Sequence, residues 1–563
     1  MTRRRTPWVA LGAAAAGLVL GCSSPGATSA PAATAPPAAA FDPLAVARAS
    51  AGVVGNPEAA VPPQCYTRTD GVSNPCWVCH TAGLGPNTRD DVELQASYGF
   101  SEAAQVNHWT NLFVDRGPFI AATPDAEILA WVRQDDYGPL RAALAAQPGY
   151  RGWVPDLDLD RGFDDDGFAR DGSGWRAVRY QPFPGAFWPG GGSTDDVFVR
   201  LPDAFRRGAD GVPSREIYRL NLALVEAAIA GVDDPATLAL DREVEPIDER
   251  LLGVDLDGDG EVRAATDRIR RLPPRYAGAA AAVKVEALVL PLGTELMHSV
   301  RYLDPDEPGL RARRMKELRY MRKVEAPDAW ARLRAYEHEA DEKDEGRLPR
   351  YRGDALEGLV NAFGWRLQGF IEDADGRLRL QTDEEHRFCM GCHQNLGVTV
   401  DSTFALARKV PGRDGWRPQD LRGLRDRPQV GHVDGEVLTY FRRVGGGDET
   451  RSNDELIARY VRRAATAGTP PELDDVALRR AGPGGELDLV GLLAPSRARA
   501  LALDKAYLAV VREQSFVRGR DAVLAPATRV QRRVDDASTG LAAAGRVYRD
   551  GRSHLRWDPA VSR

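Results

Sequence analysis

One five-residue pattern, Cys-x-x-Cys-His, constrains this chain more than any other feature, because it occurs twice. It reads Cys-Trp-Val-Cys-His at residues 76–80 and Cys-Met-Gly-Cys-His at residues 389–393. The chain has only six Cys and eight His among 563 residues, so two chance copies are improbable. The fold must therefore serve two such motifs, whose His residues are 313 positions apart.

The spacing suits the covalent attachment of haem. Two thiols about one helical turn apart can add to the two vinyl groups of one haem, and the next residue brings an imidazole to the iron. A redox pair of Cys does not need the His, and the Cys pairs of a zinc ribbon lie ~15–20 residues apart. A disulfide within each short motif would close a small, strained loop. We therefore expect two covalently bound haem c groups, with thioether and proximal iron ligands supplied by Cys76, Cys79, His80, Cys389, Cys392 and His393.

The other side of each haem iron takes a second ligand in an electron-transfer protein and stays open in many haem enzymes. His108 follows His80 by 28 residues and is the candidate for the first haem, the alternative being a hydrogen-bonded core histidine. His298 is the candidate for the second haem, and His432 is its alternative.

Three further residues lie outside this assignment of ligands. His386 lies three residues before Cys389 and is as compatible with a surface position as with a neighbouring haem. His338 lies among acidic residues on a charged segment, where we expect it to be solvated. Cys65 is either a buried apolar thiol or a thiolate near the first haem.

The N-terminus has the pattern of an export signal. A basic segment, Arg3 to Arg5, precedes an apolar stretch from Trp8 to Leu20 that ends at Gly21-Cys22. This arrangement resembles the lipobox of bacterial lipoproteins, in which the Cys is acylated and becomes the new N-terminus. The resemblance implies lipidation at Cys22 and an exported lipoprotein of the cell envelope. The resemblance also implies that Ser23, rather than an Asp, after that Cys directs the protein to the outer membrane, facing the periplasm or the cell surface.

With the export signal, the two motifs resemble dihaem c-type cytochromes. The resemblance implies electron transfer through haem iron, with other cytochromes or a membrane dehydrogenase as redox partners. Bacterial dihaem peroxidases have their haem motifs much closer together. The alternatives are a dihaem oxidoreductase with one open haem, either peroxidase-like or acting on a small inorganic or sulfur substrate, and a binding protein with structural haem. No catalytic residue is assigned.

Composition excludes two other classes. A net charge of −7 and a pI of about 5.8 argue against nucleic-acid binding, and a mean hydropathy of −0.37 argues against a polytopic membrane protein. Removal of residues 1–21 takes away three arginines and lowers the charge to −10. A redox partner that docks by charge should therefore present a basic surface.

Two acidic segments are candidates for binding a cation. Asp255, Asp257 and Asp259 alternate before a glycine, as in the first half of an EF-hand loop, so Ca²⁺ is a candidate cofactor. The twelfth loop position is Thr266 rather than Glu, and a solvated acidic turn is the alternative. Residues 156–171 hold seven Asp in a less specific pattern.

We expect a multi-domain fold that is mainly α-helical, with irregular loops and some β-structure. Ser214 predicts the start of a helix over residues 215–230, and Ser496 predicts another over about 497–514. The charged residues 310–345 also predict helices. The expected division is a signal peptide at 1–21, a lipidated linker at 22–45, a first haem region with the acidic loop at 46–270, a second haem region at 271–450 and a helical region at 451–563.

Overall fold

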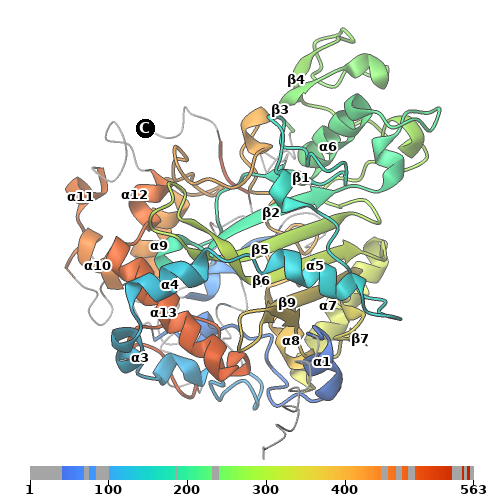
Figure 1. The fold of residues 1–563 in the computed structure, drawn as a ribbon. Coiled ribbons are helices and arrows are strands. Elements are labelled where there is room, and N and C mark those ends of the chain that lie inside the picture. Colours follow the sequence, from blue (N-terminus) through green and yellow to red (C-terminus); the bar gives the residue numbers. More distant parts are fainter. Residues whose placement is uncertain are drawn as a thin grey trace, which may run out of the picture. The chain divides into compact units, whose positions relative to one another are not determined.

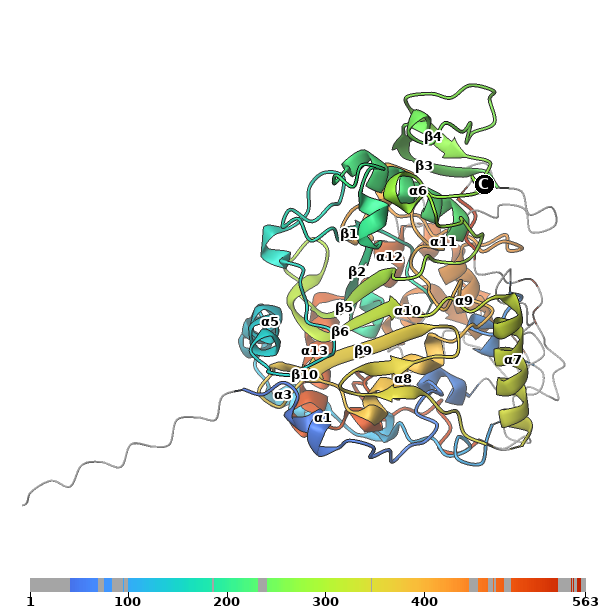
Figure 2. The same cartoon turned by 90° about the vertical axis from the view of Figure 1, so that its right-hand side faces the viewer.

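An antiparallel sheet lies at the centre of the folded chain in this computed structural model (Figures 1 and 2). Its strands follow the spatial order β1-β2-β5-β6-β9-β8-β7, and β10 pairs with β9 beside this path. Their bounds are β1 (Arg176–Val178), β2 (Thr194–Arg200), β5 (Glu295–Leu303), β6 (Arg311–Lys323), β7 (Arg352–Asp354), β8 (Gly358–Val360), β9 (Trp365–Glu372) and β10 (Leu378–Leu380).

The structure describes the chain from residue 41 onwards with several gaps. The described ranges are 41–68, 75–83, 95, 100–184, 187–230, 240–345, 347–444, 454–463, 469, 472–479, 488–534, 548, 550 and 554–557. The predicted signal peptide and the predicted lipidation site at Cys22 lie outside these ranges. Within the described residues, no helix has the length and apolar character needed to cross a membrane.

The two faces of the sheet carry separate apolar cores, because side chains alternate along each strand. The first face packs against α5 (Tyr137–Ala145) through Phe198, Met297, Leu318, Tyr320 and Phe370. The second face packs against α6 (Arg215–Ala230) and α8 (Asp383–Cys392) through Val197, Val199, Leu296, Met321 and Leu367. The second Cys-x-x-Cys-His motif begins on α8, so it lies over this second face.

Other helices and short strands surround the sheet (Figure 1). α4 contacts β6, α13 contacts β5, and α1 contacts β10. β3 and β4 pair with each other next to α6, and β11 pairs with β12. The remaining bounds are α1 (Ala45–Ala49), α3 (Gly117–Ala122), α4 (Asp125–Val132), β3 (Arg242–Ile247), β4 (Thr266–Ile269), α7 (Ala329–Asp344), α9 (Glu436–Val444), α10 (Asp454–Tyr460), β11 (Val461–Arg463), β12 (Glu472–Leu473), α11 (Asp475–Arg479), α12 (Leu489–Leu493) and α13 (Arg497–Glu513).

The expectation of a mainly α-helical fold is wrong, because the chain is a mixed α/β protein built on this antiparallel sheet. The error is clearest at residues 310–345, whose first part forms the long strand β6 rather than a helix. The many charged residues of β6 obscure the two-residue alternation of buried and exposed side chains that is typical of a strand. Glu317 is buried on this strand and is neutralised there by Arg319 and by Arg520, each at 2.9 Å.

Two of the predicted helices are confirmed. α6 begins after Ser214, whose hydroxyl accepts a hydrogen bond from the Ile217 N–H at 3.3 Å. α13 begins after Ser496, whose hydroxyl accepts one from the Arg499 N–H at 3.3 Å. Asp42–Arg563 forms one compact unit, and its sheet pairs β2 with β5 across the expected boundary at residue 270.

Candidate functional site

Both Cys-x-x-Cys-His motifs line one cavity with a volume of about 520 Å³. Cys76, Cys79 and His80 of the first motif face it, as does Cys392 of the second. The volume lies within the ~300–1,000 Å³ range of pockets for small molecules and cofactors. Apolar and aromatic side chains also line the cavity, among them Phe100.

The two motifs are joined through direct backbone contacts. The N–H of Val398, which follows the second motif, donates a hydrogen bond to the Cys79 carbonyl at 3.2 Å. A Cβ on Gly397 would lie 1.9 Å from the Thr81 carbonyl oxygen, so the two segments touch. Within the second motif, a Cβ on Gly391 would lie 1.7 Å from the carbonyl oxygen of Ala60. The fold therefore brings together segments that are about three hundred residues apart.

The first motif lies in a short helical turn that starts at a 3₁₀ helix, Pro75–Val78. The Cys76 carbonyl accepts hydrogen bonds from the N–H of Cys79 at 3.1 Å and of His80 at 2.8 Å. Trp77 points away into the core, where its ring stacks on His432 with 6.0 Å between ring centroids. This turn places both Cys of the first motif on the cavity wall.

The second motif ends α8, whose start is strongly specified. Thr382 and Glu385 form a capping box, in which each side chain bonds the backbone of the other. Arg379 binds both carboxylate oxygens of the buried Glu385, at 2.9 and 3.0 Å. Cys389 lies on the side of α8 that faces the sheet, and its burial there raises the pKa of the thiol.

His393 follows α8 directly, and hydrogen bonds hold it in place. Its ring Nδ1 lies 2.9 Å from the Ser402 carbonyl, which can only accept a hydrogen bond, so Nδ1 carries the proton. Asn361 donates a hydrogen bond to the His393 carbonyl at 2.7 Å. Burial lowers the pKa of His393 to about 4, which keeps the ring neutral. The Nε2 lone pair is then the one available to a metal, as in His ligands whose other nitrogen is held by a carbonyl.

His298 lies close to His393, on the second face of the sheet. Besides burial, the charge of Arg319 lowers the pKa of His393, and Arg319 is the residue paired with His298 on β6. The Nε2 of His298 lies 3.0 Å from the buried carboxylate of Asp195, which also accepts a hydrogen bond from the Tyr180 hydroxyl. A carboxylate that orients an imidazole in this way is a common outer partner of a metal-binding His.

The other histidines predicted from the sequence have different surroundings. His108 bonds the Ala103 carbonyl through Nε2 at 3.3 Å and does not line the cavity. His386 uses both ring nitrogens, since Nδ1 bonds the Thr382 carbonyl and Nε2 accepts the Gly369 N–H, each at 2.9 Å. His386 therefore connects α8 to β9. His432 packs on the first motif rather than the second.

Sequence reasoning did not place any residue of α7 at the cavity wall. His338 is solvated as expected, with 64% of its side chain exposed, but it also lines the cavity from α7, where its Nε2 lies 3.3 Å from a Glu342 oxygen. The signal lies in the helical spacing, because the cavity-lining residues of α7 recur at i, i+3, i+4 and i+7. They are Ala335, His338, Glu339 and Glu342.

The acidic loop before β4 brings carboxylates together in a different set from the predicted one. Oxygen atoms of Glu249, Asp255 and Asp257 all lie within 4.8 Å of one another. Asp259 instead forms an ion pair with Arg263 at 2.6 Å. Both oxygens of Asp255 accept backbone N–H groups of the loop, at 2.6 and 3.0 Å. The chain satisfies much of this loop itself, and Ca²⁺ stays a prediction.

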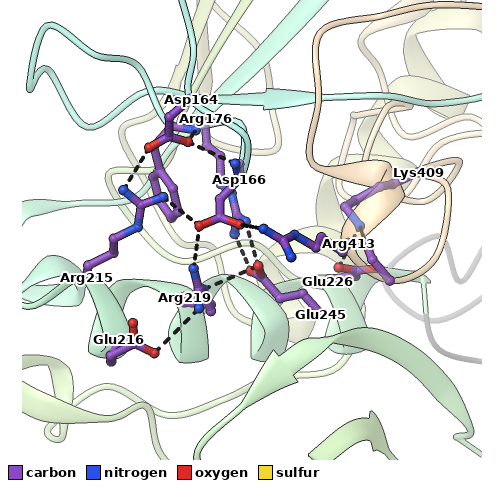
Figure 3. Close-up of polar contacts among 12 residues, drawn as sticks. Asp164, Asp166, Arg176, Arg215, Glu216, Arg219, Glu226, Glu245, Lys409 and Arg413 are labelled. Carbon is purple, nitrogen blue, oxygen red and sulfur yellow. Dashed lines mark hydrogen bonds and ion pairs between the residues drawn. The ribbon is translucent and has the colours of Figure 1, made fainter.

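The Asp-rich segment at 156–171 pairs with arginines (Figure 3). Asp166 lies among Arg215, Arg219 and Arg413, at 2.9, 2.8 and 2.5 Å. Asp164 binds Arg215 at 2.8 Å. These guanidinium groups supply the positive charge that a bound cation would otherwise bring, and Arg215 and Arg219 fasten the segment to α6.

Comparisons with known proteins place the chain in a lipoprotein family. Residues 49–465 match the model of a family described as "-like lipoprotein". An "Uncharacterized lipoprotein" of Aquifex aeolicus (strain VF5) is 32% identical over 529 residues, which cover 83% of this chain and 86% of the relative. No solved structure matches the chain. The chain belongs to this lipoprotein family, whose name indicates an exported protein anchored in the cell envelope by lipid.

Proposed function

We propose that this lipoprotein is a dihaem c-type cytochrome that transfers electrons at the bacterial cell envelope. The observation that carries the proposal is the single cavity shared by the two Cys-x-x-Cys-His motifs, which contact each other through the Val398–Cys79 hydrogen bond. A chain that carries electrons between two haems needs them close together. The contact between two motifs that are remote in the sequence supports the proposal.

The residues present fit the proposed haem groups. Cys76 and Cys79 would hold one haem with His80 as its proximal ligand, and the Cys389–His393 motif would hold the other. His393 has the tautomer that a proximal ligand requires, because Ser402 accepts its Nδ1 proton. Haem iron supplies one-electron redox chemistry when bound.

We propose His298 as the second ligand of the haem held by His393. Its Nε2 lies 3.0 Å from the carboxylate of Asp195, and a proton on Nε2 that donates to this oxygen leaves the lone pair on Nδ1. Tyr180 donates to the same carboxylate and so fixes it in turn. Burial raises the pKa of the Tyr180 hydroxyl well above its ordinary value, so this hydroxyl stays a donor.

Counting haems tests the proposal. We expect two haems per chain from a pyridine haemochrome spectrum and from the intact mass of the mature protein. The double variants C76S/C79S and C389S/C392S should each keep one haem, since each loses one pair of thioether bonds. Cys65→Ser is the matched control, because Cys65 lines the same cavity outside the motifs, and it should keep both. Any number other than two in the wild type would refute the proposal.

A dihaem oxidoreductase is the second candidate. The observation that favours it is the size and polarity of the cavity, whose wall continues past the motifs to Glu339, Glu342 and Arg350. In that case one haem is high-spin and binds cyanide or peroxide, whereas an electron carrier has two low-spin, six-coordinate haems. The EPR spectrum of the oxidised protein separates the two candidates.

We also propose that the lipid anchor lies in the outer membrane, with Ser23 following the lipidated Cys22. Redox partners are then other cytochromes or a membrane dehydrogenase with a basic docking surface, because the mature chain is acidic.

A further inference from the structure

We propose that His338 is the second axial ligand of the haem whose proximal ligand is His80. The inference rests on the proposed function, since it requires haem to be attached at the first motif. It assigns a ligand on α7, a helix that belongs to neither haem motif.

Placement in the cavity is the first argument. The imidazoles of His80 and His338 both line it. The described histidines outside the motifs that do not line the cavity are His108, His298, His386, His432 and His554. His108, the ligand expected from the sequence, instead directs Nε2 to the Ala103 carbonyl.

The position of α7 is the second argument. Tyr336 is buried and packs on Phe363, with 5.0 Å between ring centroids, which fastens the helix to the sheet domain. The face of the helix that carries His338 and Glu342, one turn apart, lines the cavity. Figure 2 shows α7 along one side of the sheet. His338 is therefore held at the wall by a packed helix rather than by a free loop.

The ring of His338 also has a carboxylate partner, which is the third argument. Its Nε2 lies 3.3 Å from Glu342, whose side chain is 16% exposed, while the His338 side chain itself is 64% exposed, so its ring is open on the cavity side. A proton shared with that carboxylate sits on Nε2 and leaves the Nδ1 lone pair for a metal. His298 and Asp195 repeat this arrangement next to His393, at 3.0 Å. Each motif therefore has one carboxylate-oriented histidine assigned to it.

Substitution of His338 tests the inference by spectroscopy. In His338→Ala, the pyridine haemochrome spectrum and the intact mass should still show two haems per chain, because the thioether bonds do not involve His338. The EPR spectrum of the oxidised variant should show one of the two low-spin haems converted to high-spin. Added imidazole should restore the low-spin signal, and His338→Met should keep the haem six-coordinate with a higher reduction potential.

His108→Ala is the matched control and should keep both haems low-spin. Two low-spin haems in His338→Ala would overturn the inference, as would a high-spin haem in the wild type. The first result leaves the proposed function intact, because the haem count is still two, whereas the second favours the dihaem oxidoreductase over the electron carrier. A wild-type count other than two overturns both.

Discussion

At the residue scale, the buried carboxylate of Glu385, on the helix that carries the second motif, is neutralised by arginines of the same chain. Burial alone would raise the pKa of Glu385, but Arg379, which binds both of its oxygens, lowers that pKa to about 2. Arg520 adds to this effect and donates a hydrogen bond to the Glu385 carbonyl at 2.6 Å. The carboxylate is therefore ionised at neutral pH and helps to hold the start of α8.

Glu385→Gln should destabilise the protein by about 3–5 kcal/mol at pH 7, because Arg379 then stays buried without a counter-charge. The pKa of Glu385 falls from its ordinary 4.5 to about 2 on folding, so its contribution is full above pH 4.5 and is lost as pH falls through about 2. Urea unfolding at pH 7, 4.5 and 3 should show that the variant loses less stability than the wild type on acidification.

The exposed Glu357→Gln serves as the control and should leave the unfolding free energy within about 0.5 kcal/mol of wild type. An unchanged unfolding midpoint in Glu385→Gln at pH 7 would contradict the role given to the Arg379 pair.

At the element scale, α8 and the segment after it connect the two motifs. Gly397 brings its backbone against Thr81, and the neighbouring Val398 bonds Cys79. Gly391, inside the second motif, does the same against Ala60. These glycines matter because a side chain would separate the two backbones, whatever the local helix propensity.

Gly397→Ala should cost about 1–3 kcal/mol of unfolding free energy, because its Cβ would meet the Thr81 backbone at 1.9 Å. The same substitution at Gly309 is the control, since nothing lies within 4 Å of its added Cβ. Thermal unfolding of both variants with haem attached provides the comparison. Equal unfolding temperatures for the two variants would argue against close contact between the motifs.

At the scale of the whole molecule, the N-terminal part of the folded chain packs against the start of α8 before the chain reaches the first motif. The N–H groups of Gly52 and Gly55 donate to Asp383 and Glu384 at the start of α8, each at 2.6 Å. Leu380 donates to the Pro43 carbonyl at 2.8 Å. The folded body therefore uses the chain just beyond the predicted tether to bring the first motif to the second.

Cys22→Ser should move the exported protein from the membrane fraction to the soluble fraction, because the acyl chains are lost and the charge of −10 does not attract anionic lipid. Ser24→Ala is the control and should stay with the membrane. Fractionation and immunoblotting measure the shift, and a haem count of two should persist in both variants. Retention of Cys22→Ser in the membrane would exclude lipid at Cys22 as the anchor.

Several features were predictable because they depend on residues close together in the chain. The two haem-type motifs, the export signal and the helices that start after Ser214 and Ser496 follow from local spacing and capping. The sheet was not predictable. The charged residues of β6 obscure its alternation of polar and apolar side chains, and they are paired only in the folded chain, as Glu317 is with Arg520.

The sequence alone determined the chemistry within each motif, where one helical turn places two thiols and an imidazole together. Only the tertiary structure decided that both motifs share one cavity, and that His298 and His338 lie near them. The physical reason is that these relations depend on strand register and on helix packing. Both join residues hundreds of positions apart, and no local pattern encodes which of them meet.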